Sequence, residues 1–559
     1  MIKNITLLLT PGERAFYMNF LMPPLALGVI NGYLRESALD VEPYDLNVCL
    51  KKKSLHQDRG AWLFLYDKDA VIDYLRTGTN DRFDKRFSQL LEDIDFERTD
   101  LVGISIGSNF SFFEIHSGFA IARYIQKKFH KPIVFGGDNI QYLFQFRDMY
   151  KELWEQVLQN FQYIFVGPGE RSLVSLIRVL NNQITDRSYK DLSGAIYLTD
   201  KGLTANSQDE PTLCKPDFSG LEVSAYTLCL FKDHPRAQEL NETFFFKWPF
   251  GNALLASERN RAKLAEPEKE ETLFIPYIFN YNCPFKCAFC TQSDIKKKRV
   301  IAKDAEAVVN DLESLINRYN TRYFYFFDNA FNYNNSFVVD FCRIVKERGL
   351  RFYWCDCARF SGLTMDLLVK MREAGCRKLL FGFESGSSKI LKSIDKRIDL
   401  DQARQVLRWC KECGIWAELE VILGLPYEFE EDFRDTYDFI KENLPFINSF
   451  TINKYFVVPE SLMGRYPRRY GMKLIKLNNK YEKRLEKSAR FFLDAVDSQD
   501  NKITVANFQV YHYKEVNGRG FKQIIKETQD KVMRLNQLYI QLETFKETQI
   551  YRMVHRKKN

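Results

Sequence analysis

Residues 272–294 read TLFIPYIFNYNCPFKCAFCTQSD, an apolar run followed at once by three closely spaced cysteines. The run over 272–280 has the length and the aromatic and β-branched content of a buried strand. Cys283, Cys287 and Cys290 then follow, with three and two residues between them. This stretch therefore predicts a strand whose C-terminal loop gathers three thiols.

Three thiols in one loop point to an iron–sulfur cluster with one iron left open. Four cysteine thiolates commonly hold a cubane cluster, so three leave one iron free to bind a small ligand. Structural zinc normally takes four protein ligands, and no fourth Cys or His lies near these three in the sequence, which counts against zinc. The loops after the strands of a β/α barrel carry its chemistry. We therefore expect a reactive cluster here.

The sequence on the C-terminal side of this loop continues as alternating strands and amphipathic helices. Further strands are predicted at 322–328, 351–358, 378–385, 416–424 and 449–458. Six β/α units in a row favour a partial (β/α)6 barrel over residues 271–460. Residues 461–559 are basic and mostly helical in pattern, and their sequence does not indicate a role.

Residues 1–185 predict a second α/β domain ahead of the barrel. Its apolar runs, which alternate with helical patterns, lie at 5–9, 41–46, 101–107, 132–137 and 163–167. This is the pattern of a doubly wound, Rossmann-like sheet, in which ligands bind outside the carboxyl ends of the strands. Residues 186–270 predict a hairpin that turns at residues 200–202, followed by a charged connector.

Composition narrows the class of protein. A chain of 559 residues is expected to form two to four domains, and 45% hydrophobic with 28% charged residues is ordinary for a globular protein. The N-terminal apolar run is too short for a signal peptide, and no stretch approaches the roughly 18 to 20 apolar residues of a membrane span. The net charge of +8 forms no stripe suited to nucleic acid. We expect a cytoplasmic protein that binds neither membrane nor nucleic acid.

The cysteine loop resembles that of the radical S-adenosylmethionine (SAM) superfamily, whose signature is CxxxCxxC with an aromatic residue, here Phe289, before the third cysteine. The resemblance implies a 4Fe–4S cluster on Cys283, Cys287 and Cys290, whose open iron binds SAM. It also assigns SAM contacts to residues at the ends of later strands. These are Asp328, Asn329, Arg359, Glu384, Ser385, Ile422 and Gly424. Many relatives have a second Asp at the position of Asn329, which is a departure from the pattern.

Residues 1–170 resemble the cobalamin-binding domains that precede some radical SAM barrels. The resemblance implies cobalamin contacts at strand ends and glycine loops, where a missing side chain lets backbone approach a flat corrin. The residues concerned are Ser105, Asn109, Gly136, Gly137, Gly167, Gly169 and Glu170. The DxHxxG motif of cobalamin mutases, whose His ligates cobalt, is absent from the sequence, so the lower face of the corrin is expected to lack a His ligand.

These resemblances lead to one main hypothesis and two alternatives. The first is a cobalamin-dependent radical SAM methyltransferase, which methylates an unactivated carbon of a natural product or peptide through methylcobalamin and a 5′-deoxyadenosyl radical. It implies a flavodoxin- or ferredoxin-type electron donor. The second keeps the radical chemistry but makes the N-terminal domain a scaffold, with epimerisation, cyclisation or rearrangement as the outcome. The third is a non-catalytic iron–sulfur sensor. The polar residues at the later strand ends count against it, because a sensor needs no cofactor pocket.

Overall fold

The computed structural model describes residues 1–16, 22–107, 112–148, 150–226, 228–231, 269–291, 299–476 and 511–555. The chain divides into two compact units. The described part of unit 1 lies within residues 1–226, and that of unit 2 within residues 228–476 and 511–555. No helix in these described ranges is both long enough and apolar enough to cross a membrane.

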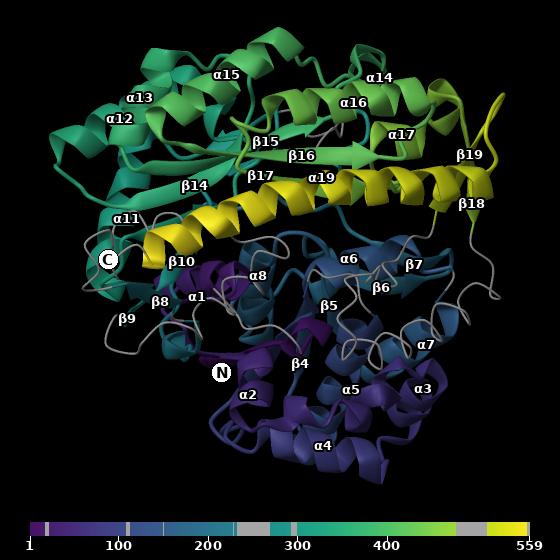
Figure 1. Cartoon of the computed structure of the whole chain (residues 1–559). Coiled ribbons are helices and arrows are strands. Elements are labelled where there is room, and N and C mark those ends of the chain that lie inside the picture. The colour runs from purple at the N-terminus through teal and green to yellow at the C-terminus, as the bar shows by residue number, and fades with distance from the viewer. Residues whose placement is uncertain are drawn as a thin grey trace. The chain divides into compact units, whose positions relative to one another are not determined.

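Unit 1 is a doubly wound α/β domain (Figure 1). Its parallel five-stranded sheet has the order β2-β1-β3-β4-β5. The strands are β1 Asn4–Leu9, β2 Asp40–Asp45, β3 Leu101–Ser105, β4 Ile133–Gly136 and β5 Tyr163–Ile164. The helices are α1 Leu25–Glu36, α2 Leu46–Lys52, α3 Lys68–Thr77, α4 Asp81–Leu91, α5 Phe112–Phe129, α6 Asp138–Gln145, α7 Lys151–Asn160 and α8 Gly169–Leu180. The strand order reverses between β1 and β3, which is where sheets of this order bind ligands.

Strand β5 is shorter than the sequence predicts. Apolar residues run on to Val166, but β5 ends at Ile164. Phe165 instead forms an antiparallel bridge with Ala195, and the Val166 amide donates to the Gly194 carbonyl at 2.9 Å. The following hairpin, β6 Ile196–Thr199 with β7 Gly202–Ala205, turns at residues 200–201 as predicted. The residues just before this hairpin, Gly194 and Ala195, therefore pair with the segment after β5.

Unit 2 contains the predicted partial barrel. Its parallel strands follow one another in chain order, β10-β13-β14-β15-β16-β17. Their bounds are β10 Phe274–Tyr277, β13 Tyr323–Phe326, β14 Tyr353–Ala358, β15 Cys376–Glu384, β16 Trp416–Leu423 and β17 Ser449–Lys454. The intervening helices are α11 Ala305–Tyr319, α12 Asn335–Glu347, α13 Met365–Glu373, α14 Ser388–Ser393, α15 Leu400–Cys413 and α16 Glu430–Asn443. This confirms the α/β class and the six β/α units.

Buried aromatic rings show which face of the barrel sheet lies under the helices. Trp354 of β14 stacks on Phe326 of β13 and meets Phe341 of α12 edge-on. Phe383 of β15 stacks on Phe439 of α16, with ring centres 4.6 Å apart. Because side chains alternate along a strand, the neighbouring residues on each strand point to the opposite face. We call that opposite face the inner face of the barrel.

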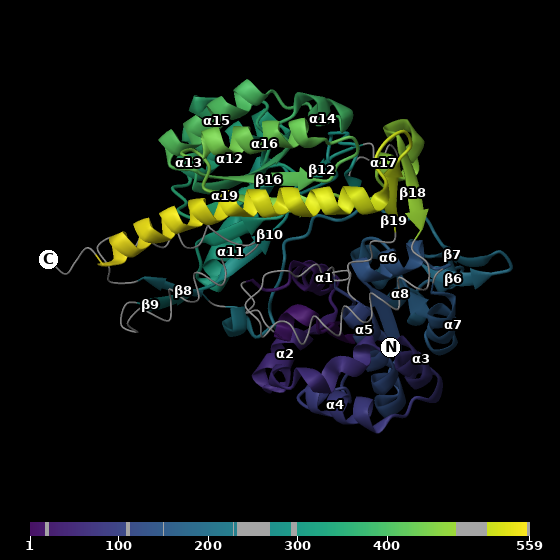
Figure 2. The ribbon, with the colours of Figure 1, turned by 45° about the vertical axis from the view of Figure 1, so that its right-hand side comes forward.

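The C-terminal helix belongs to the same unit as the barrel. Helix α19, Phe521–His555, runs alongside β17 and β16 (Figures 1 and 2), and the Tyr539 ring meets Phe450 of β17 edge-on. Short elements precede it, namely α17 Leu462–Arg465 and the antiparallel pair β18 Met472–Lys476 and β19 Tyr511–Glu515. Two further antiparallel pairs are β8 Leu228–Phe231 with β9 Lys269–Thr272, and β11 Asn280–Tyr281 with β12 Ile301–Ala302. The charged connector predicted within 186–270 lies outside the described residues over 232–268.

Candidate active site

The three cysteines lie in the loop after β10, as the sequence predicts. Cys287 is 7% exposed, while Cys283 and Cys290 are less buried. The Cys290 amide donates to the Cys287 carbonyl at 3.1 Å, which forms a turn. Two backbone hydrogen bonds fix Ala288, at the centre of the loop: its amide donates to Ile394, and its carbonyl accepts from Met463.

Two cations lie beside these thiols. The Arg359 guanidinium donates to the Cys287 sulfur at 3.9 Å, and its carbon lies 3.6 Å from the centre of the Phe285 ring. Its other terminal nitrogen donates to the Lys396 carbonyl at 2.8 Å. Burial raises the pKa of the Cys283 thiol, whereas Arg359 and Lys396 act to lower it. These cations would offset the negative charge that thiolate ligands bring.

Lys396 also connects this loop to Glu384, a predicted SAM contact. The Lys396 ammonium forms an ion pair with the Glu384 carboxylate at 2.6 Å and lies 5.8 Å from the centre of the Phe289 ring. Glu384 has a φ of +64°, where the β15–β16 register shifts. The sequence contained no signal for Lys396, because its role depends on a fold that returns it to the cysteine loop.

Asp328, two residues after β13, interacts with a second buried carboxylate, Asp356, which lies within β14. Asp328 Oδ1 accepts the backbone amides of Phe279 and Asn280 at 3.0 and 2.6 Å. Its Oδ2 and the Oδ2 of Asp356 are buried with no hydrogen-bond partner in this structure. Burial raises the pKa of both carboxyls well above the usual range, and for Asp356 the charge of Asp328 adds to this. Asp356 was not predicted from the sequence, and Asn329, which was predicted, is exposed.

Ser385 faces helix α16. Its hydroxyl lies 3.1 Å from that of Thr436, and the Gly386 amide donates to the same Thr436 oxygen. With an exposed fraction of 2%, Ser385 is sealed against α16. Its contact with SAM therefore stays a prediction, and the contacts present here hold the loop after β15 in place.

Ile422 and Gly424, at the end of β16, lie in different surroundings. Ile422 is partly exposed on the inner face. Gly424 has a φ of +84°, and a Cβ there would meet Thr528 Oγ1 of α19 at 2.6 Å. The Gly424 carbonyl also accepts the Tyr513 hydroxyl at 2.6 Å. In this structure the segment that approaches Gly424 closely is the C-terminal part of the chain itself.

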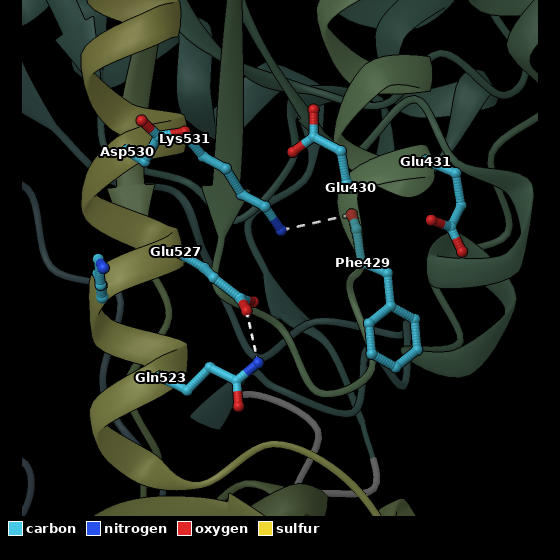
Figure 3. Close-up of a pocket in the computed structure, with 8 residues that line it drawn as sticks. Phe429, Glu430, Glu431, Gln523, Glu527, Asp530 and Lys531 are labelled. Carbon is cyan, nitrogen blue, oxygen red and sulfur yellow. Dashed lines mark hydrogen bonds between the residues drawn. The ribbon is translucent and has the colours of Figure 1, made fainter.

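A buried ion pair fixes the loop after Gly424 to α19. Glu428 Oε2 accepts the amides of Gly424 and Leu425, and its Oε1 pairs with Lys531 Nζ at 2.9 Å. Lys531 also donates to the Glu428 carbonyl and to the Phe429 carbonyl, and Figure 3 draws the second of these bonds. Both charged side chains are less than 5% exposed. A surface cavity with several acidic residues lies beside this pair, between the start of α16 and α19 (Figure 3).

The predicted cobalamin residues of unit 1 differ in how open they are. A Cβ at Gly136 would meet nothing within 4 Å, and at Gly169 only Ile30 at 3.8 Å. A Cβ at Gly137 would meet the Ile106 carbonyl at 2.3 Å, and at Gly167 the Gln208 side chain at 2.7 Å, so these two glycines permit packing within the chain.

The other residues that the sequence predicts to contact cobalamin are Ser105, Asn109 and Glu170. The Ser105 carbonyl accepts the Thr10 amide at 3.1 Å, which joins the ends of β3 and β1. Asn109 lies outside the described residues. Glu170, the second residue of α8, is 6% exposed, and its Oε2 has no hydrogen-bond partner in this structure. Burial raises the pKa of this carboxyl.

A family comparison identifies the cysteine loop and its barrel. Residues 277–440 match the radical SAM superfamily, from the last residue of β10 into α16. The chain therefore contains a radical SAM domain. The match includes the three cysteines and also Asp328, Asp356 and Glu384.

Curated relatives match parts of the chain. An uncharacterized methyltransferase of Pyrococcus horikoshii is 31% identical over 160 residues, which are 29% of this chain and 35% of that protein. The cytidylyl-2-hydroxyethylphosphonate methyltransferase of Streptomyces wedmorensis is 21% identical over 290 residues, 51% of this chain and 53% of that protein. The chain thus spans about a third of the length of the first relative and about half of the second.

Two solved structures resemble the chain over most of its length. The radical SAM methyltransferase TsrM from Kitasatospora setae, with cobalamin and a [4Fe–4S] cluster bound, gives a TM-score of 0.52 at 17% identity and covers 85% of this chain and 77% of TsrM. The cobalamin-dependent radical SAM enzyme OxsB, with aqua-cobalamin bound, gives 0.54 at 15% identity, with coverage of 89% and 67%. At these identities the likeness shows the fold.

The residues of the radical SAM domain fit a cluster and a bound amino acid group. Within the described ranges, no three His, Cys, Asp or Glu side chains converge on one point as ligands of a single ion do. A cubane does not require such convergence, because its cysteines bind separate irons. The three thiols, with Arg359 beside Cys287, suit a cluster, and the unpartnered Oδ2 of Asp328 suits an ammonium group.

The buried carboxyl pair leads to a prediction about stability. The folded-state pKa of Asp356 is raised, so its stabilising contribution is present below the usual carboxyl pKa of about 4 and is lost as the pH rises toward the folded-state value. Asp356→Asn should therefore raise the free energy of unfolding at pH 8 by about 1 kcal/mol or more and flatten its decline with pH. Denaturant unfolding at several pH values measures this, with the exposed Asp438→Asn as control. An Asp356→Asn variant that is less stable than wild type at pH 8 would contradict the prediction.

Proposed function

We propose that this chain is a cobalamin-dependent radical SAM enzyme that methylates an unactivated carbon of a small-molecule or peptide substrate. The observation that carries the proposal is the presence, in one chain, of a radical SAM domain and a sheet of order β2-β1-β3-β4-β5. At the ligand-binding edge of that sheet lie the open Gly136 and Glu170, whose Oε2 has no hydrogen-bond partner in this structure. The folds of TsrM and OxsB, both with cobalamin bound, support this reading.

The proposal divides the work between residues 1–185, which would bind cobalamin, and residues 271–460, which would bind the cluster and SAM. When bound, the cluster and SAM supply a carbon-centred radical, and cobalamin supplies a methyl carrier. Cys283, Cys287 and Cys290 would hold the cluster and leave one iron open. Asp328 would accept the ammonium group of SAM.

Other side chains would hold this site in position. Arg359 donates to the Cys287 thiol and to the backbone of Lys396, and Lys396 in turn pairs with Glu384. In unit 1, the buried oxygen of Glu170 would accept an amide N–H from the corrin periphery. We also propose a cytoplasmic location and a flavodoxin- or ferredoxin-type electron donor.

An absorption spectrum tests the cobalamin part. Anaerobically reconstituted protein is incubated with hydroxocobalamin and desalted, and the corrin bands are measured. We expect about one equivalent of retained cobalamin, and its loss in Gly136→Leu, whose side chain would fill the open space at the strand end. Gly60→Leu, at an exposed glycine with no atom closer than 3.9 Å to a Cβ, is the control.

Wild-type protein without corrin bands would refute cobalamin binding. Radical chemistry with a structural N-terminal domain would then be the better description, with epimerisation, cyclisation or rearrangement as the outcome. Retention that is equal in wild type and Gly136→Leu would place the cobalamin elsewhere.

A further inference from the structure

The inner face of the barrel carries three carboxylates near one another. Glu418 and Glu420 lie two residues apart on β16, on the face opposite to that of the buried Leu419 and Val421. Gly382 of β15 is paired in register with Glu420, and Glu384 ends the same strand. These three carboxylates lie on the inner face of the radical SAM domain. Their charges therefore affect which ligands the barrel can bind.

Two of these carboxylates have a buried lysine as partner. Glu418 pairs with Lys378 at 2.6 Å, and the two side chains are 3% and 1% exposed. Glu418 also accepts the hydroxyls of Ser449 and Thr451 at 2.6 and 3.1 Å, so both of its oxygens are occupied. Glu384 pairs with Lys396 at 2.6 Å. Each of these negative charges is therefore balanced within the chain.

Glu420 differs from both neighbours because no cationic side chain of the described residues pairs with it. Its one recorded partner is the amide of Asn453 on β17, which donates to Oε2 at 2.7 Å. The Glu420 side chain is partly exposed, and Asn453 is exposed. Among the described residues, Glu420 is thus a partly exposed carboxylate that no cation pairs with, between two carboxylates that are neutralised.

The surroundings of Glu420 make its charge costly when the barrel is empty. Burial, then the charge of Glu418, and then that of Glu384 raise the pKa of Glu420 to about 7, while Asn453 and Lys378 act in the opposite direction. Cys357 of β14 also interacts electrostatically with Glu420. A positive charge placed beside Glu420 would relieve this cost, as Lys378 and Lys396 do for its neighbours.

We propose that Glu420, oriented by Asn453, binds a basic nitrogen of the substrate inside the barrel. The proposal rests on the proposed function, because it assumes that the substrate enters the inner face. It specifies the substrate class as one with an ammonium, amidinium or guanidinium group. Tyr325 and Phe327, which pack edge-to-face on β13 and just beyond it, are an aromatic surface on the same face; Phe327 is 38% exposed.

Binding of a matched pair of probes tests this assignment. Tryptamine and tryptophol share an indole and an ethyl chain and differ in an ammonium against a hydroxyl group. Titration calorimetry with cluster-reconstituted wild type at pH 8, where Glu420 is largely ionised, should show tryptamine binding more tightly than tryptophol. In Glu420→Gln, we expect tryptamine affinity to fall about tenfold or more and tryptophol affinity to stay unchanged, since a charge-assisted contact is lost.

The pH dependence supplies a second readout. Tryptamine affinity of wild type should decrease from pH 8 to pH 6, as Glu420 takes up a proton, and that of Glu420→Gln should not. Glu412→Gln, at an exposed position on α15, is the control and should behave as wild type. Equal tryptamine affinity in wild type and Glu420→Gln, or tryptophol binding as tightly as tryptamine, would overturn the proposal.

These outcomes are separable from failure of the proposed function. SAM cleavage and corrin retention, measured on the same preparations, report on the radical and methyl chemistry and need no substrate. Intact SAM cleavage with no preference for tryptamine would refute the role of Glu420 alone. Loss of SAM cleavage in wild type would refute the radical function, whatever the probes do.

Discussion

Cys287→Ala is expected to abolish reductive cleavage of SAM. Cys287 is the most buried of the three loop cysteines and has Arg359 beside its sulfur. With two thiols left, the loop cannot hold a cluster that three ligands bind, so reconstituted iron should fall from about four per chain to a small remainder. Iron and sulfide analysis, together with the yield of 5′-deoxyadenosine under dithionite, measures both effects.

Cys413→Ala provides the matched control for this variant. Cys413 lies at the end of α15, is only partly buried, and has its sulfur 3.6 Å from that of Met365. With Cys410 it forms a CxxC pattern, but the pair lies on a helix away from the loop. Its variant should keep wild-type iron content and SAM cleavage. SAM cleavage that persists in Cys287→Ala would refute the assignment of the loop as the cluster site.

Lys531→Met is expected to destabilise the protein by about 3 to 5 kcal/mol. It removes the partner of a buried carboxylate, and an uncompensated buried charge is costly. Burial already raises the pKa of Glu428 even with Lys531 beside it. Because the Glu428 carboxylate also holds the amides of Gly424 and Leu425, the variant should loosen the loop after β16. Denaturant unfolding measures the loss of stability.

Two further variants separate the charge effect from simple loss of packing. Lys526→Met alters an exposed lysine of the same helix and should change stability by less than about 0.5 kcal/mol. Glu428→Gln combined with Lys531→Met removes both charges and should recover part of the loss, as a double-mutant cycle measures. A double variant that is less stable than Lys531→Met alone would show that packing, not the unpaired charge, causes the effect.

Local pattern predicted the strands well where both faces of a strand are buried. The barrel strands were expected at apolar runs, and all six formed there, because a parallel sheet covered by helices requires such runs. The strand predicted at 163–167 is longer than β5, because a run of apolar residues does not show which neighbouring segment will pair with it. Ala195, which pairs with Phe165, is 30 residues further along the chain.

For a similar reason, the sequence predicts some residues of the site and misses others. Cysteine spacing is local, so three ligands could be read directly. Asp356 lies within β14, so an argument from strand ends finds Asp328 but not Asp356. Lys396 and Lys531 could not, since each acts on a carboxylate or loop that only the folded chain brings near.

The sequence by itself determined the radical SAM domain, the order of its strands and the three cysteines, because these depend on spacing and periodicity along the chain. The tertiary structure decided the charge balance. Burial in a common interior pairs Glu418 with Lys378, Glu384 with Lys396 and Glu428 with Lys531, and it leaves Glu420 without a counter-charge among the described residues. Such pairings join residues up to 103 positions apart. They follow from the cost of an unpaired charge in low-dielectric surroundings, which no local pattern records.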